Sequence, residues 1–297
     1  MTTDSARLPP NGYPHEPLDL REAVISSSGL TMEVTRLASI LILMVSATSG
    51  PVSAADADGS TTCPQNVVTP ETPAPGERTL LLDEAGACMH AGQPVQAIAL
   101  FSELIRIDPR DAFSYMNRGT VRIAVGEIES GMDDYNAALN LRPDLMEAWY
   151  NRGNVALLHL HRFQDAIGDF SEAIRLKSDF APAYCNRGFA RMQLGQYDGA
   201  LADYNQGVEC DPKQAYCHFN RANLYLITGE YQKAIVDFTA ALNKSPADAL
   251  TLSKRGLAYE GLGQREQALA DYRAALQLDP KLESAKEGIG RLGGGGG

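Results

Sequence analysis

The sequence has few basic residues and no basic run. Its 297 residues include 26 Lys and Arg against 37 Asp and Glu, which gives a formal net charge of −11. Proteins bind nucleic acids and anionic membrane surfaces electrostatically through clustered positive charge. We therefore expect no nucleic-acid partner and no electrostatic binding to membranes.

Signatures of catalysis are also missing. The sequence contains no P-loop, no Gly-x-Ser-x-Gly, no His-Glu-x-x-His and no dinucleotide fingerprint. His159 and His161 stand close together but lack the Cys or acidic partners of a metal-site pattern. We expect no catalytic residue, no metal and no small-molecule cofactor, and hence a protein that is not an enzyme.

No apolar run reaches the ~20 residues that a membrane-spanning helix needs. The longest, at 37–47, follows Arg36 and precedes small residues that end at Ala54, which is the layout of a secretory signal peptide. We predict a signal peptide at 32–54, cleavage near Ala54 or Ala55, and export to the periplasm or the medium. The alternative is that this segment is retained as an N-terminal membrane anchor. Only in that case do we expect the protein to associate with a membrane. Residues 1–31 precede this signal and are interpreted as non-translated or as a disordered extension.

The abundant feature of the sequence is repetition. Small residues recur at intervals of 34, 35, 34 and 34 residues, at Gly119, Gly153, Gly188, Ala222 and Gly256. Alanines, aromatics and prolines recur in step with them, and such a period is typical of stacked supersecondary units. Six copies are predicted, at 78–111, 112–145, 146–180, 181–214, 215–248 and 249–282.

Each copy has apolar residues at helical spacing on both sides of a turn, which predicts two antiparallel helices. Five copies place Gly at that turn, where a helix ends most easily with positive φ: Gly92, Gly126, Gly195, Gly229 and Gly263. After the copies, 283–292 is predicted to be a capping helix and 293–297 a Gly tail. Residues 55–77 are rich in Pro, Thr and acid, and we expect a disordered linker there.

This pattern resembles the tetratricopeptide repeat (TPR), of the exported bacterial type. The signature positions of the third copy are Trp149, Gly153, Phe163, Ala166, Phe170, Ala173 and Ser178. The resemblance implies an all-α fold, a right-handed α-solenoid of six helix pairs with a C-terminal capping helix. Two copies depart from the pattern. The third has one extra residue and His161 in place of the turn Gly, and the first has Ala85 for Gly and Pro94 for the aromatic.

The resemblance also implies a protein or peptide partner. We expect a non-catalytic scaffold or adaptor that binds an extended peptide segment in its concave groove. One alternative is a cell-envelope assembly factor that uses the convex faces. Another is a regulatory subunit or chaperone of an envelope enzyme. The fold by itself does not choose among them.

Arg stands at position 7 of five copies, counted from the first residue of each, and Asp stands at position 23 of the same five when the extra residue of the third copy is left out of the count. The first copy has Glu84 and Leu100 instead. Because the two positions face each other across a helix hairpin, we predict structural ion pairs. The five are Arg118 with Asp134, Arg152 with Asp169, Arg187 with Asp203, Arg221 with Asp237, and Arg255 with Asp271.

Asn recurs at position 6, on the helix that lines the groove in this family. An Asn amide offers a donor and an acceptor, which suits a peptide backbone, and the row looks like the asparagine ladder of O-GlcNAc transferases. The alternative is that these amides only bond neighbouring helices. The predicted peptide-binding residues are Asn117, Asn151, Asn186 and Asn220 at position 6, Asn154 and Asn223 at position 9, and Phe113, Met116, Tyr150, Phe189, Tyr216, Phe219 and Lys254.

An exported protein with five cysteines invites disulfide pairing. Cys210 ends one predicted helix and Cys217 begins the next, so we predict that they pair, with two buried thiols as the alternative. Cys63 in the linker is predicted to pair with Cys88 in the first copy. Cys185 is then left over on the groove face.

Overall fold

The computed structural model describes residues 76–293, and within this range the chain forms thirteen helices and no strand. Six pairs follow one another, and a single helix ends the array. The helices are α3 (Glu77–His90), α4 (Pro94–Ile107), α5 (Ala112–Ala124), α6 (Ile128–Leu141), α7 (Met146–Leu158), α8 (Phe163–Leu176), α9 (Ala181–Gln193), α10 (Tyr197–Cys210), α11 (Ala215–Ile227), α12 (Tyr231–Leu242), α13 (Ala249–Gly261), α14 (Arg265–Leu278) and α15 (Glu283–Gly293).

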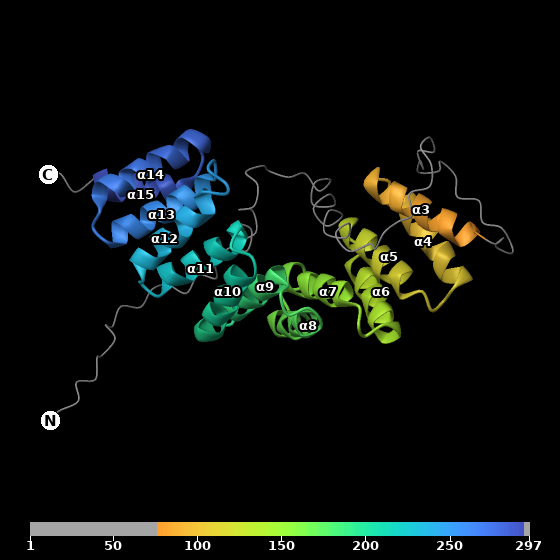
Figure 1. Cartoon of the computed structure of the whole chain (residues 1–297). Coiled ribbons are helices and arrows are strands. Elements are labelled where there is room, and N and C mark those ends of the chain that lie inside the picture. The colour runs from red at the N-terminus through yellow and green to blue at the C-terminus, as the bar shows by residue number, and fades with distance from the viewer. Residues whose placement is uncertain (1–75, 294–297) are drawn as a thin grey trace, which may run out of the picture.

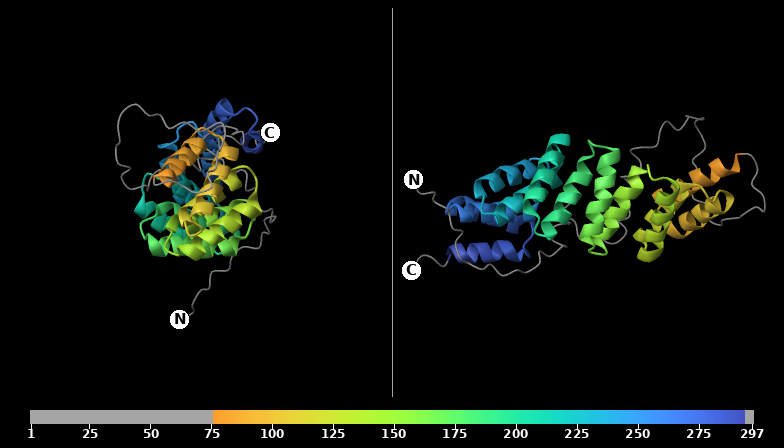
Figure 2. Two further views of the ribbon diagram at one scale, coloured as in Figure 1. Left: turned by 90° about the vertical axis from the view of Figure 1, so that its right-hand side faces the viewer. Right: turned by 90° about the horizontal axis from the view of Figure 1, so that it is seen from below.

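The helix pairs stack in chain order along a curved array (Figure 1). The N-terminal pair, α3 and α4, lies at one end, and α13 to α15 lie at the other, as the view from below also shows (Figure 2). In the middle of the curve α5 and α7 lie on its inner side and α6 and α8 on its outer side. Each helix packs on its pair partner and on the next pair, which is the arrangement of an α-solenoid. The predicted fold class is confirmed.

The tight turns explain how each pair reverses direction. Gly92, Gly126, Gly195, Gly229 and Gly263 have φ between 67° and 88°, a left-handed conformation that costs Gly little. In the third repeat His161 takes this role with φ 52°. The extra residue lengthens that turn to four residues, 159–162, so His159 becomes the C-cap of α7.

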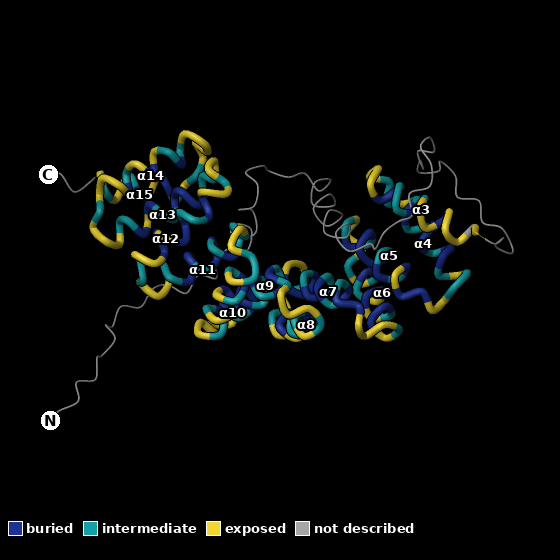
Figure 3. The backbone as a smooth tube through the Cα atoms, in the orientation of Figure 1, coloured by how far each residue is buried: buried dark blue, intermediate teal, exposed yellow. Residues whose placement is uncertain are grey.

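The core lies between the two helix layers, where the tube in Figure 3 is buried, while the turns are exposed. The small residue at position 8 faces the aromatic ring at position 24 of the same pair. A Cβ on Gly153 would meet Phe170 Cε1 at 2.9 Å, and one on Gly188 would meet Tyr204 Cε1 at 2.8 Å. These glycines allow two helices to approach closely, and their φ angles are ordinary.

The boundaries of the array differ slightly from the expected ones, because α3 begins one residue earlier and α15 includes Gly293. The extension at 1–31, the signal peptide at 32–54, nearly all of the linker, Cys63 and the last four residues lie outside the described residues. Among the described helices none is long and apolar enough to cross a membrane.

Candidate functional site

The predicted Arg and Asp residues meet in all five pairs. Arg Nη2 donates to Asp Oδ1 at 2.6–2.8 Å, and Arg Nε donates to the same carboxylate at 2.6–3.0 Å. The Asp side chains are 4–9% exposed and the Arg side chains 14–21%. Such two-point charge-assisted contacts fix the register of one helix against the other.

Each of these arginines also reaches the preceding repeat. Its Nη1 donates at 2.7–3.1 Å to a side-chain oxygen at position 25, on the second helix of that repeat. We call this three-residue unit the clasp. The acceptors are Ser102, Asn136, Ser171, Asn205 and Thr239. One guanidinium therefore connects the two helices of its own repeat and also connects that repeat to the one before it.

The carboxylates of the clasps differ in electrostatics. Burial raises the pKa of Asp169 above its ordinary value of 3.8, although the hydrogen bonds from Arg152 act against it. Burial also raises the pKa of Asp237, but the bonds from Arg221 and His218 outweigh it and the net pKa is lowered. Asp134 and Asp203 each bond a second arginine as well, Arg122 and Arg191. Repeats that share one sequence pattern thus stabilise the charged form of their Asp to different extents.

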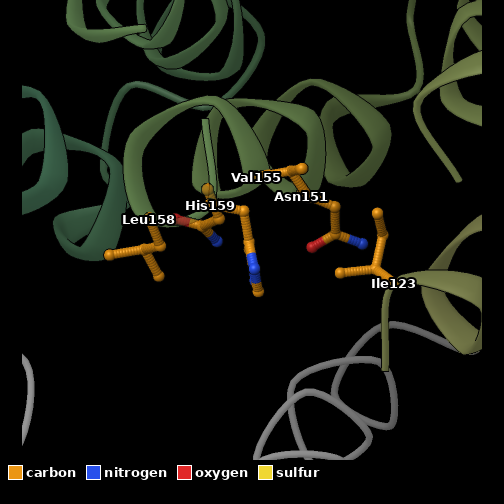
Figure 4. Close-up of a pocket in the computed structure, with 6 residues that line it drawn as sticks. Ile123, Asn151, Val155, Leu158 and His159 are labelled. Atoms are coloured by element: carbon orange, nitrogen blue, oxygen red, sulfur yellow. The ribbon is translucent and has the colours of Figure 1, made fainter. Parts of the chain in front are cut away.

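An open pocket lies between α5 and α7 (Figure 4). Two of the predicted asparagines, Asn151 and Asn154, line it on α7. Its other walls are Ile123 of α5 and, from α7 and its C-cap, Val155, Leu158 and His159. Burial, and then the nearby His161, lowers the pKa of His159, which favours its neutral form. The pocket therefore offers two amides and apolar walls with no carboxylate or guanidinium.

Asn154 connects this pocket to a buried polar cluster. Asn186 Nδ2 of α9 donates to Asn154 Oδ1 at 2.7 Å and to the Tyr150 hydroxyl at 3.2 Å. Burial raises the pKa of Tyr150, and its bonds with Asn154 and Asn186 oppose the rise. Asn186 therefore behaves as the alternative interpretation expected, since its amide bonds the neighbouring helix.

Several other predicted binding residues lie in the core. Asn220 and Phe219 are 0% and 1% exposed, and the rest of this buried group are Met116, Tyr150, Phe189 and Asn223. They pack between helices and do not line an open surface. Asn117, Tyr216 and Lys254 are partly exposed, and Lys254 interacts within the chain. Phe113 is 46% exposed, and the Arg142 guanidinium lies 5.4 Å from its ring centroid.

The predicted Cys210–Cys217 disulfide is wrong. Cys217 is bonded to Cys185, and Cys210 is a free, partly exposed thiol at the end of α10. The error came from treating the inter-repeat turn as a simple hairpin. In the structure the beginning of α11 faces α9, the first helix of the preceding pair. The predicted Cys63–Cys88 pair involves a residue outside the described range and stays a prediction.

Some residues of the site were not identified from the sequence. The acceptors at position 25 vary among Ser, Asn and Thr, so no single residue type fills all five places, although each one precedes an Arg-bearing repeat. The pocket residues Leu158 and His159 stand at the start of the lengthened third turn, and Ile123 reaches the pocket from α5. In the sequence, the extra residue and His161 at the third turn are the features that could have pointed to these positions.

Family models match most of the array. Models described as "Tetratricopeptide repeat" match residues 116–180, 215–248 and 249–282, and one described as "TPR repeat" matches 190–226. The chain belongs to the tetratricopeptide repeat family. Proteins with this repeat bind proteins or peptides and are typically non-catalytic scaffolds.

Curated TPR relatives share only a short stretch with the chain. Human "Tetratricopeptide repeat protein 28" is 32% identical over 88 residues, which are 30% of this chain and 4% of that protein. Mouse "Superkiller complex protein 3" is 28% identical over 110 residues, which are 36% of this chain and 7% of that protein. The chain thus spans less than a tenth of the length of these relatives.

Solved TPR structures resemble the whole array in fold. YrrB, described as having an unusual peptide-binding site, has a TM-score of 0.54 at 24% identity, over 63% of this chain and 96% of its own. The type IV pilus biogenesis factor PilW has a TM-score of 0.63 at 19% identity, over 72% and 99%. Pseudomonas aeruginosa pilF has a TM-score of 0.65 at 17% identity, over 72% and 97%. At these identities the likeness concerns the fold.

Proposed function

We propose that this TPR protein is a non-catalytic scaffold that binds an extended, uncharged segment of a partner protein, with one group of that segment seated in the small open pocket, of about 30 Å³, between α5 and α7. The observation that carries the proposal is the presence of two amides, Asn151 and Asn154, beside three apolar residues and His159. Asn154 already accepts a hydrogen bond from Asn186, so Asn151 is the main candidate for contact with a ligand. A peptide group has one N–H donor and one carbonyl acceptor, and an Asn amide carries both an NH2 donor group and a carbonyl acceptor that can pair with them. Ile123 and Leu158 would contact the side chains of the bound segment.

Charge supports an uncharged ligand. No Asp, Glu, Lys or Arg lines the pocket, and its single titratable residue, His159, has a lowered pKa. A charged ligand side chain placed there would lose water without gaining a partner. The peptide-binding description of YrrB is consistent with this type of ligand site.

Site-directed photo-crosslinking tests the proposal. A photoreactive phenylalanine analogue at Leu158, which is 37% exposed at the pocket, is expected to capture a partner, and one at Val236, 60% exposed on α12, is not. The captured segment is then synthesised and its affinity measured by fluorescence anisotropy. Replacing Asn151 with Ala should weaken binding about tenfold, through the loss of hydrogen bonds worth about 1–2 kcal/mol.

Asn140→Ala, on the exposed side of α6, is the matched control and should leave the affinity unchanged. Capture from Val236 but not from Leu158 would reject the pocket and favour a face used in envelope assembly. Equal affinities for wild type and Asn151→Ala would reject the role of the amide.

We also propose that the protein is exported. The support is the signal-peptide layout of residues 32–54. N-terminal sequencing of the protein from cells should find a residue near Ala55. A mature N-terminus at or before residue 32 would reject cleavage.

A further inference from the structure

The fourth and fifth repeats are joined covalently through their first helices. Cys185 of α9 and Cys217 of α11 form a disulfide with their Cα atoms 5.4 Å apart. Both residues are 0% exposed. They lie 32 residues apart in sequence, so the bond crosses a repeat junction and not a helix pair.

The disulfide occupies the place of an ordinary packing contact. Cys185 is at position 5 of its repeat and Cys217 at position 3 of the next. At the two preceding junctions these positions hold a large and a small residue that share one core cluster. The equivalent pairs are Met116 with Ala148, and Tyr150 with Ala183. The cysteines therefore replace a large-with-small contact by a bond.

Gly207 of α10 completes the arrangement. A Cβ there would lie 2.7 Å from Cys185 Sγ and 2.8 Å from Cys217 Sγ, too close for non-bonded atoms. The equivalent residue is Leu104 in the first repeat and alanine in the four others, Ala138, Ala173, Ala241 and Ala275. The missing side chain thus coincides with the one junction that holds two sulfur atoms.

We propose that this junction is a covalent lock set by oxidative folding. The bond forms before α11 docks on α9 and α10, and afterwards it fixes the spacing of the two first helices. Thiol–disulfide exchange requires a thiolate to reach a sulfur atom. Since neither sulfur is accessible in the folded protein, both formation and reduction need the junction to be open.

The chemistry is a two-electron exchange with a disulfide-class oxidant. The thiolate of one cysteine attacks the oxidant disulfide and releases one of its sulfurs as a thiol. The second cysteine, as its thiolate, attacks the mixed disulfide and releases the other. The two cysteines lose two protons and two electrons, and the oxidant becomes a dithiol. Such oxidants operate in compartments outside the cytosol.

Reduced cysteines fit this junction less well. Two separate thiols occupy more space than a bonded pair, because non-bonded sulfur atoms cannot approach to bonding distance. The two sulfurs already occupy the place that a side chain at Gly207 would take, so separated thiols would have to displace neighbouring groups. Folding with reduced thiols is therefore expected to leave α11 more loosely packed on α9.

Thermal unfolding after refolding with or without a reductant tests the lock. Wild type refolded in reductant should melt about 5–10 °C lower than wild type refolded in a disulfide buffer. Cys210→Ala should behave as wild type. All proteins in this test carry Cys63→Ala, so that the predicted Cys63–Cys88 bond cannot respond to the reductant. In this background the double variant Cys185→Met with Cys217→Ala, which restores the packing pair of the second junction, should melt at one temperature in both buffers. A reductant-dependent shift that persists in the double variant would overturn the proposal.

Gly207→Ala gives a second test. Its effect on the melting temperature should have opposite signs in oxidised wild type and in the double variant. In oxidised wild type the added Cβ meets both sulfurs and should lower the melting temperature. In the double variant the same change should raise it, because Ala favours a helix over Gly. An equal decrease in both backgrounds would show that Gly207 is unrelated to the disulfide.

A third measurement covers the case in which the double variant fails to fold. During oxidative refolding of wild type, thiol alkylation is sampled together with hydrogen exchange in α11. Loss of reactive Cys185 and Cys217 should precede protection of α11. Protection that develops first, with both thiols still reactive, would overturn the proposed order.

Discussion

Asn151 in α7 and Asn220 in α11 occupy the same repeat position but have opposite surroundings. Asn151 lines an open pocket, whereas Asn220 is fully buried, and its amide lies near the Tyr216 hydroxyl without a hydrogen bond of ordinary geometry to any described residue. Asn151 lies on the first helix of the repeat with the lengthened turn, and α5 of the preceding repeat forms the other wall of its pocket. Asn220 lies on α11, which the Cys185–Cys217 disulfide joins to α9.

This comparison separates what a repeat position determines from what it does not. Position 6 determines which side of the first helix a residue faces. Whether that side is open depends on the distance to the next first helix, which the turns and the junction contacts set. We call the two regions the open half, at α5 to α8, and the closed half, at α9 to α12.

The largest expected difference concerns the clasp carboxylates. Asp203 in the closed half accepts bonds from Arg187 and Arg191, and Asp134 in the open half likewise bonds two arginines, whereas Asp169 in the open half bonds Arg152 alone, so this difference is between single repeats. Asp203→Ala leaves two partly buried arginines unpaired and should cost about 3 kcal/mol. Asp169→Ala should cost about 1.5 kcal/mol, since burial already disfavours its charge. Chemical unfolding measures both, and equal costs would remove this part of the comparison.

Two of the position-6 amides, the partly buried Asn186 and the buried Asn220, should respond in opposite directions to replacement by Leu. Asn186→Leu breaks bonds to Asn154 and Tyr150 and should destabilise the protein by about 1–2 kcal/mol. Asn220→Leu replaces an amide without hydrogen bonds of ordinary geometry and should be neutral or stabilise by up to about 1 kcal/mol. Melting temperatures of the two variants decide it. Strong destabilisation by Asn220→Leu would show that its amide makes bonds after all.

The third turn should tolerate glycine better than histidine. His161 has φ 52°, where a Cβ is unfavourable, so His161→Gly should stabilise by about 0.5–1 kcal/mol. Gly195→Ala, with φ 72° in the closed half, is the matched reversal and should destabilise by about 1 kcal/mol. A loss of stability in His161→Gly would mean that the His161 side chain has contacts that matter more than its backbone.

The smallest expected effect is a difference in pH dependence. The lowered pKa of Asp237 gives stability that is present above 3.8 and is lost as pH falls through the folded pKa. The raised pKa of Asp169 has the opposite sign, because the folded state takes up a proton first and gains stability as pH falls towards 3.8.

Unfolding of Asp237→Asn and Asp169→Asn at pH about 6 and about 3 measures these signs. The advantage of wild type over Asp237→Asn should shrink at the lower pH, and that over Asp169→Asn should grow. Asp133→Asn, an exposed residue of α6, is the control. Changes of the same sign in both variants would contradict the assignment.

The fold could be predicted from the sequence because each copy repeats the same physical requirements. The position-8 glycines need a close approach to an aromatic ring, and the Arg and Asp positions change together from copy to copy. Both signals lie within one repeat, so comparison of the copies reveals them. The turn glycines are equally local, since a left-handed residue must end the first helix.

The site was harder to predict because it depends on contacts between repeats. Cys217 faces Cys185 and not Cys210, although Cys210 is only seven residues away in the sequence. Asn220 has the same position as Asn151 but is buried by its neighbours. Such contacts follow from the rotation of one pair relative to the next, and a residue pattern within one copy carries little information about it.

The clasp also has a direction along the chain. The donor at position 7 always reaches back to position 25 of the repeat before it, and every internal repeat carries both groups. At the two ends of the array the scheme stops, with Glu84 at position 7 of the first repeat and Arg273 at position 25 of the last. If an internal unit such as 112–145 were duplicated, each copy would carry both the position-7 donor and the position-25 acceptor. Both of its junctions could then form the clasp hydrogen bonds. Natural lengthening by tandem duplication would need no compensating substitution at these contacts, whereas a copy of either terminal unit would interrupt the series.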